Sequence, residues 1–225
     1  MKAGRQLQSA QRTYGGATAD ERRRRRRAAL IDATLDIISS DGMKKLGVKE
    51  VCARARLNDR YFYESFRDCD EAVLALIDGL TMEAMTAFAD TLSSTEAELR
   101  TRVRASVETA VEFVTGDPRR GRLLIESQAT HAGRQRRQQF VVLLADIMAQ
   151  QGRELLGAAA PSDIDRKLIG LTIVSGGLEL TAMWLSGDLA VGRDHFTDFF
   201  TAFILASIHM PASLDQSAGS STVAG

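Results

Sequence analysis

The sequence predicts an all-α protein, and three observations carry this prediction. Apolar residues recur three and four positions apart along most of the 225 residues, which is the spacing of amphipathic helices. Alternating runs typical of strands are rare, and the chain contains only three prolines. Hydrophobic residues make up 44% and charged residues 26%, as in ordinary folded soluble proteins. We therefore expect about nine helices, arranged as a small head and a larger bundle.

The chain begins with a polar segment that is followed by a basic helix. Residues 1–19 are small and polar without periodicity, and we predict that they form a disordered tail. Asp20 then begins a helix, and Gly42 ends it. Six consecutive arginines, Arg22 to Arg27, occupy its first turns and cover every side of the helix. The apolar stripe of this helix consists of Ile31, Leu35 and Ile38.

Two short helices come next, joined by a brief turn. The first is expected at 46–55. Asn58 is a suitable N-cap for the second, because its side-chain oxygen can accept a free amide one turn on. Phe62 and Phe66 are four residues apart and so share one face of that helix. Two short helices in this order after a longer one indicate a helix-turn-helix, which enters DNA grooves. We assign this DNA-binding head to residues 20–84.

The remainder predicts a helical bundle. Asp68 and Glu71 have the spacing of a capping box and begin a long helix, shared by head and body, that reaches about Thr91. Further amphipathic helices are expected at about 96–115, 118–130, 133–157, 162–186 and 193–209. The body then covers 85–210, and residues 211–225 are expected to form a flexible tail.

Charge is distributed unevenly along a chain whose formal net charge is zero. Residues 1–70 hold sixteen Lys/Arg and ten Asp/Glu, whereas residues 71–225 hold thirteen and nineteen. The two sections therefore carry +6 and −6. A basic section joined to an acidic remainder is typical of a polyanion-binding head on a body with another task.

The stretch LGVKEVCARARLNDRYFYESFRDCDEAV resembles the TetR family of bacterial transcriptional regulators. The likeness runs from about Arg24 to Leu76 and includes the family's pattern aliphatic–Tyr–x–x–Phe, here Phe62-Tyr63-Glu64-Ser65-Phe66. Three positions depart from the family: Arg56 replaces a turn glycine, Gly47 replaces a capping Thr or Ser, and Cys69 replaces a Lys that binds phosphate. The resemblance implies a helix-turn-helix head on a ligand-binding and dimerising bundle.

The second short helix is expected to read DNA. Its first residues would meet base edges, where Arg can pair with guanine, Asn with adenine and Asp with a cytosine amine. By resemblance, Tyr63 would contact phosphate. Lys49, on the first of the two short helices, would contact phosphate or guanine. The arginine run fits an arm along the phosphate backbone, although a solvated charge run or a nonspecific polyanion patch remains an alternative. The predicted DNA-binding residues are Arg26, Arg27, Lys49, Asn58, Asp59, Arg60, Tyr61 and Tyr63.

The resemblance also implies an effector pocket in the body, although each candidate is an ordinary core residue in the simpler interpretation. The effector is expected to be a small apolar or amphipathic molecule. The candidate ligand-binding residues are Met85, Phe88, Phe113, Gln128, His131, Met148 and Trp184.

Two glycines, Gly176 and Gly177, interrupt a predicted helix, where each costs about 1 kcal/mol relative to Ala. Close approach of a second helix explains them, and a kink beside the pocket is the alternative. By resemblance, the last two long helices of each protomer form the interface of a homodimer. The predicted interface residues are Leu171, Val174, Gly177, Leu178, Phe199 and Phe203.

The sequence thus predicts a ligand-responsive, sequence-specific regulator that binds double-stranded operator DNA as a homodimer, by resemblance a cytoplasmic repressor. The alternatives are a nonspecific nucleic-acid-binding protein and a helical enzyme with an apolar pocket. No catalytic constellation, phosphate loop or metal-ligand spacing is present, so no enzyme activity and no cofactor are expected. No apolar run approaches the length of a membrane span, and no membrane partner is expected.

Overall fold

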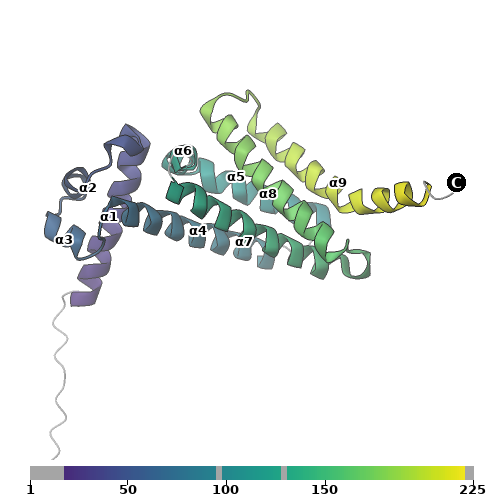
Figure 1. Ribbon diagram of the computed structural model, residues 1–225, viewed down its shortest axis with the longest axis horizontal. Helices are drawn as coiled ribbons and strands as arrows, with labels where there is room; N and C mark the ends of the chain where they lie inside the picture. Colours follow the sequence, from purple (N-terminus) through teal and green to yellow (C-terminus); the bar gives the residue numbers. More distant parts are fainter. Residues whose placement is uncertain (1–17, 95–97, 128–130, 221–225) are drawn as a thin grey trace, which may run out of the picture.

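The computed structural model describes residues 18–94, 98–127 and 131–220, without the side chains of residue 132 and residues 209–220. Nine α-helices and two short 3-10 turns account for most of this part of the chain, which confirms the all-α prediction. The helices are α1 (Ala19–Asp41), α2 (Val48–Ala55), α3 (Asp59–Tyr63), α4 (Cys69–Ser94), α5 (Leu99–Thr115), α6 (Pro118–Glu126), α7 (His131–Leu156), α8 (Asp163–Ser186) and α9 (Arg193–Ser220). The turns are η1 (Met43–Lys45) and η3 (Gly157–Ala159). Figure 1 shows α1–α3 as a head at one end, with α4 running from it along the body.

Local capping fixes where the first helix starts. The Thr18 hydroxyl accepts a hydrogen bond from the Glu21 amide at 3.1 Å, and the Glu21 carboxylate accepts one from the Thr18 amide at 2.8 Å. This capping box satisfies two amides that a helix start leaves free. The helix therefore begins at Ala19, inside the segment predicted as a tail, and residues 1–17 lie outside the described residues.

The head has a compact apolar core. Phe62 from α3 is completely buried, and its ring centroid lies 5.7 Å from that of Phe66. Both rings belong to one cluster with Leu30 of α1 and Val51 of α2. The two phenylalanines that the sequence places on one face thus fasten α3 to the other head helices.

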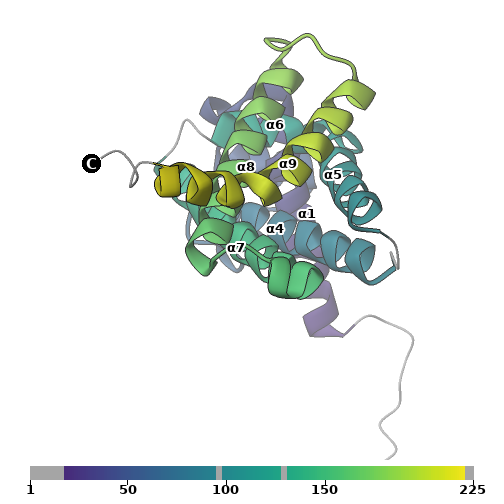
Figure 2. The same ribbon diagram turned by 90° about the vertical axis from the view of Figure 1, so that its right-hand side faces the viewer.

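The body consists of long helices that pack side by side, as the end-on view in Figure 2 shows. At the α7–α8 crossing, a Cβ added to Gly170 would lie 2.8 Å from the Ala145 carbonyl oxygen, so only glycine permits this approach. A second cluster joins α5 to α9 through Val107, Val111, Phe196 and Phe200.

Helix α6 belongs to the body by sequence but packs on the head. Its Leu123 lies in a buried cluster with Leu35, Ile38, Val73 and Leu76 from α1 and α4. Pro118 occupies the first turn and the Asp117 side chain accepts from the Arg119 amide at 3.0 Å, so the helix has a defined start. Head and body are consequently joined by two helices, α4 and α6.

Two differences from the sequence-based expectations concern apolar helices. The last helix continues to Ser220, so residues 211–220 are helical where a flexible tail was expected, and residues 221–225 lie outside the described residues. By length and composition alone, α4 and α8 could each cross a membrane, with mean hydropathies of 1.5 and 1.6. Long core helices of a helical body meet the same two criteria, and apolar residues of both helices face the cavity described below.

Candidate DNA-binding head and interior cavity

Helix α3 presents a polar side to solvent. Asn58 caps it, with its side-chain oxygen accepting from the Tyr61 amide at 3.4 Å. Asp59 and Arg60 are exposed, and Tyr63 is 62% exposed. Phe62 is buried on the opposite side, so the predicted base-reading residues and the predicted phosphate contact share the outer surface of the helix.

Two arginines of the basic run brace this helix. The Arg26 guanidinium carbon lies 4.3 Å from the centroid of the Tyr61 ring, and that of Arg27 lies 4.9 Å from the centroid of Phe66. Both are cation–π contacts. The structure therefore brings the run beside α3, where these two side chains stabilise the head. Arg23, Arg24 and Arg25 are exposed one turn earlier.

Arg60 is held by Glu64, the residue that caps the end of its helix. Its Nε donates to Glu64 Oε1 at 2.9 Å, and the second Glu64 oxygen lies 3.9 Å from Arg26 Nη2. The Arg60 side chain is 81% exposed, and such pairs contribute little to stability. Arg60 could therefore leave Glu64 and hydrogen-bond a guanine edge instead, with little loss of protein stability.

The turn before α3 contains the backbone strain that the missing glycine predicts. Arg56 has φ 55° and ψ 41°, and it is the one non-glycine residue with positive φ among those the structure describes. The Leu57 amide donates to the Cys52 carbonyl at 2.9 Å and closes the turn. Gly47 supplies no side-chain cap to α2, as its departure from Thr or Ser implies.

The two cysteines lie in the head core and carry protonated thiols at neutral pH. Burial, together with the nearby Asp59 carboxylate, raises the pKa of Cys52 to about 11. Burial and then Asp68 raise the pKa of Cys69. Cys69 packs against the cluster that contains Cys52, and neither has thiolate character that would favour redox chemistry.

The body encloses a cavity of about 420 Å³ between α4–α9. Its wall is mainly aliphatic and aromatic, and it includes Phe88, Phe113 and Met148 from the candidate ligand-binding residues. Trp184 does not line it: the indole donates to the Val191 carbonyl at 2.9 Å and stacks on Phe196, which does.

The other candidate ligand contacts lie elsewhere. Met85 is half-buried on α4, His131 is exposed at the start of α7, and neither lines this cavity. Gln128 lies outside the described residues.

Sequence reasoning missed the polar part of the cavity wall. The arginines that reach the cavity are Arg102, Arg120, Arg136, Arg137 and Arg166, and none of the described wall residues is Asp or Glu. For Arg102 the sequence does contain a signal. This arginine occurs within an apolar stripe of helical spacing that is formed by Leu99, Arg102, Val103 and Ser106.

The predicted dimer residues divide into two groups. Val174, Gly177 and Leu178 line the cavity of the protomer. Leu171 is half-buried, whereas Phe199 and Phe203 are 50% and 41% exposed with stacked rings. The outward side of α8 instead exposes Ile164, Leu168, Gly176 and Met183.

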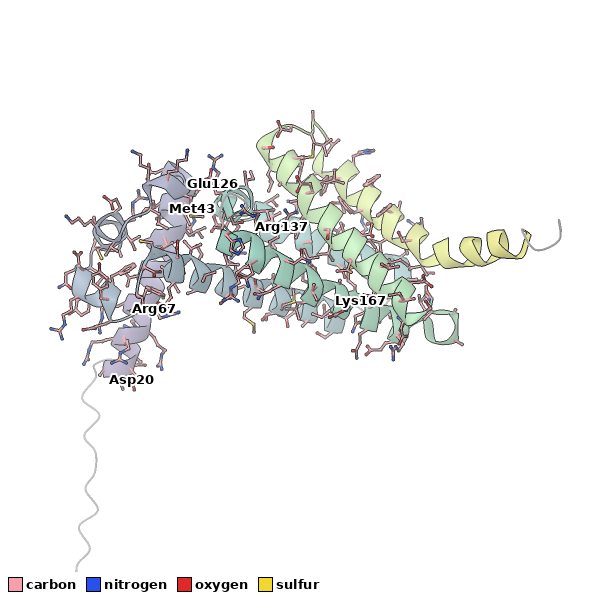
Figure 3. The ribbon with its side chains drawn as sticks, in the orientation of Figure 1. Asp20, Met43, Arg67, Glu126, Arg137 and Lys167 are labelled. Atoms are coloured by element: carbon pink, nitrogen blue, oxygen red, sulfur yellow. The ribbon has the colours of Figure 1, made fainter. Side chains whose placement is uncertain are left out.

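Charged contacts connect α6 to the head. Arg119 Nη1 donates to Asp32 at 3.0 Å and to Asp36 at 2.5 Å on α1, and Arg119 Nη2 contacts Asp117 at 2.9 Å. These carboxylates raise the pKa of Arg119, and Arg119 lowers that of Asp117. At the other end of α6, the Met43 amide donates to Glu126 at 3.4 Å (Figure 3).

The described chain combines a three-helix head with a hollow helical body. Three solved structures share this fold. FadR from Bacillus subtilis in complex with stearoyl-CoA is 16% identical, covers 81% of this chain and 99% of its own, and has a TM-score of 0.67. A TetR-like regulator from Rhodococcus sp. RHA1 is 19% identical over 80% of this chain and 93% of its own, with a TM-score of 0.62.

The third is a TetR family regulator from Marinobacter aquaeolei VT8, 16% identical over 84% of this chain and 98% of its own, with a TM-score of 0.61. No family model and no curated protein matches the chain. These likenesses establish that the chain has the TetR-type fold. Among the described residues, no group of three His, Cys, Asp or Glu is placed to hold a metal ion.

Proposed function

We propose that this protein is a homodimeric, ligand-responsive, sequence-specific DNA-binding regulator of the TetR type, a cytoplasmic repressor that a small molecule releases from its operator. The observation that carries the proposal is the outer side of α3. It exposes Asp59, Arg60 and Tyr63 while Phe62 anchors the helix in the head core. Those side chains are suited to base edges and phosphate in a major groove.

The dimer is supported by the exposed apolar side of α8 and α9. Phe199 and Phe203 on α9 and Ile164, Leu168 and Met183 on α8 are exposed large apolar side chains, which an isolated soluble protein seldom gathers on its surface. Two protomers joined there would place two α3 helices in successive major grooves about 34–36 Å apart on a near-palindromic operator.

Release by a ligand requires the cavity to influence the heads. Leu123 of α6 lies both on the cavity wall and in the cluster with α1, while the adjacent Arg119 binds α1 carboxylates. A ligand that binds best when α6 and α4 are shifted would favour a head spacing that does not fit DNA. We therefore propose that α4 and α6 together transmit ligand binding from the cavity to the head.

An amphipathic effector suits the cavity wall. The Bacillus subtilis regulator of the same fold was solved with stearoyl-CoA, a molecule with a long apolar chain and a polar head. The cavity here combines many aliphatic residues with several arginines, which is the chemistry that such a molecule requires.

Selection of bound DNA from a random pool tests the proposal. We expect one near-palindromic sequence to be enriched by the wild-type protein, and Arg60→Ala to lose the preference at one base position, at a cost of about 1–3 kcal/mol. Arg67→Ala is the matched control, because Arg67 is 85% exposed beyond the end of α3 and pairs with Glu71.

Salt dependence separates this function from nonspecific binding. Enrichment of no sequence, with affinity for all DNAs falling equally as salt rises, would support the nonspecific alternative and overturn the proposal. Enrichment unchanged in the Arg60→Ala variant would remove Arg60 from base reading.

A further inference from the structure

The cavity wall has an uneven balance of charge. Five arginines reach the cavity, and among the described residues that line it there is no carboxylate. An apolar space with cations at its surface and no anions favours a ligand that brings negative charge with it.

Four of these arginines are balanced from outside the cavity. Arg120 pairs with Glu83 at 2.8 Å, Arg136 with Asp78 at 3.3 Å and Arg137 with Glu179 at 3.2 Å. Arg166 pairs with Asp163 at 2.5 Å and also donates to two backbone carbonyls. Their positive charge is therefore already neutralised by neighbouring carboxylates.

Arg102 differs from the other four. Its Nη2 donates to the Leu92 carbonyl at 3.3 Å, and none of the ion pairs within the described part of the chain involves it. Its Nε is buried and has no hydrogen-bond partner, and the same holds for Arg120 Nε, but Arg120 has the Glu83 carboxylate as a counter-charge and Arg102 has none among the described residues. A buried, charged donor without an acceptor is costly, and an entering carboxylate would relieve that cost with a charge-assisted hydrogen bond.

The position of Arg102 gives the ligand an orientation. Helix α4 runs away from the head and α5 returns, so the first turn of α5, which holds Arg102, lies at the far end of the body (Figure 1). Arg137, near the head, and Lys167, next to Arg166 at the far end, mark the two ends in Figure 3. From Arg102 to Val114 the cavity follows α5 for about 18 Å, at 1.5 Å per residue.

We propose that the cavity binds an amphipathic monoanion, a carboxylate with a long unbranched apolar tail, with the carboxylate on Arg102 and the tail directed toward α6. This inference rests on the proposed function in taking the cavity as the effector site. It adds the charge of the effector, the residue that binds that charge and the direction of the chain. Leu123 and Ile77 at the head side of the cavity would contact the tail end.

Binding of a matched pair of probes to the full chain tests this inference. Trp184 is the only tryptophan and stacks 4.7 Å from Phe196 on the cavity wall, so its fluorescence reports binding. We expect myristic acid to bind at least about tenfold more tightly than its methyl ester, which has the same tail without the charge. The Arg102→Gln variant should bind the two alike, through loss of affinity for the acid.

Arg100→Gln is the matched control, because Arg100 is exposed two residues earlier on α5 and should keep the wild-type preference. Retained binding of the ester by Arg102→Gln shows that the cavity is intact. If that variant does not fold, Arg102→Lys decides: a kept preference for the acid supports the inference, and equal binding overturns it.

Other outcomes separate the possible failures. Equal affinity of the wild-type protein for acid and ester overturns the inference. So does an unchanged preference in Arg102→Gln, which would leave Arg102 as a structural cap on the α4 carbonyl. If DNA selection enriches an operator while acid and ester bind alike, only this inference fails. If the acid preference is present but no DNA sequence is enriched, the proposed function fails instead.

Discussion

The head buries Leu30, Ile38, Val51 and Phe62 with no exposed surface, whereas the body surrounds a cavity of about 420 Å³. The head is thus packed like an ordinary protein interior, and its helices have little freedom to move relative to one another. The body retains space that its own side chains do not fill. Tight packing suits a head that is proposed to hold side chains in place for a DNA groove. Unfilled space suits a body that is proposed to change when a ligand binds.

The two regions also differ in where they accept backbone strain. The positive-φ residues of the body are Gly157 and Gly187, which adopt this conformation at little cost. The head places Arg56 in that conformation, in the turn that aims α3. Strain kept at a turn next to the proposed DNA-reading helix fits a functional demand on the arginine side chain.

The comparison predicts its largest effect for Phe62→Ala. Removing a completely buried ring from the head should lower the free energy of unfolding by about 3–5 kcal/mol and abolish DNA binding, because α3 loses its anchor. Urea unfolding followed by circular dichroism measures the loss. Met82→Ala is the control, since Met82 is 66% exposed and should change stability by less than about 0.5 kcal/mol. Similar midpoints for both variants would show that the head is not tightly packed.

A glycine pair on α8 tests how closely the body is packed around its cavity. Gly170→Ala would place a Cβ 2.8 Å from the Ala145 carbonyl, which is backbone and cannot move aside, so we expect a loss of about 1–3 kcal/mol. Gly176→Ala meets nothing within 4 Å and should stabilise the isolated protomer by up to about 1 kcal/mol through helix propensity. Urea unfolding of dilute protein compares them.

The Gly176→Ala variant also tests the proposed dimer. Sedimentation at rising concentration should show that Gly176→Ala weakens self-association, since the added methyl would face the partner helix. If self-association were unchanged by Gly176→Ala and by Phe199→Asp, the α8–α9 surface would not be the interface.

Sequence predicted the head more completely than the body, and the reason is the range of the interactions involved. The Asn58 cap and the shared face of Phe62 and Phe66 depend on residues within one or two turns. Helix α8, in contrast, is apolar on most sides, so no stripe sets its rotation. Gly176 and Gly177 differ by about 100° around that helix, and only tertiary contacts show that the first faces outward.

The role of Arg102 could not be predicted from the sequence for a related reason. Its position in an apolar stripe of α5 is visible, but an arginine there usually finds a carboxylate. Whether Arg102 finds a carboxylate depends on which helices surround it in the fold. The neighbouring helix is α4, and the group that it offers to Arg102 is the Leu92 carbonyl.

The ion pairs between α6 and α1 test whether head and body are coupled as one unit. Arg119→Ala should lower stability by about 1 kcal/mol at pH 7, a value limited by solvent screening. Arg119 lowers the pKa of Asp117, so this contribution is present above the unfolded pKa of about 3.9 and is lost as pH falls through the lower folded value. The difference between wild type and variant should therefore shrink below pH 4.

Urea midpoints measured from pH 7 to pH 3 follow that difference. Arg122→Ala is the neighbouring control, because Arg122 is exposed on the same helix and pairs with Glu126 within it. A difference equal for both variants would count against a specific α6–α1 link, whereas a difference independent of pH would count against the Arg119–Asp117 pair at the start of α6.

The smallest expected effect concerns the strained turn of the head. Arg56→Gly and Arg56→Ala both remove the charge, but only glycine adopts φ 55° without penalty. We expect Arg56→Gly to be more stable than Arg56→Ala by about 1 kcal/mol, as measured by thermal unfolding. If the strain serves DNA binding through a phosphate contact, both variants should reduce the salt slope of operator affinity by about 0.9, because each lacks the same cation. A salt slope equal to that of the wild-type protein would mean that Arg56 does not contact DNA. DNA binding would then not explain the strained backbone of Arg56.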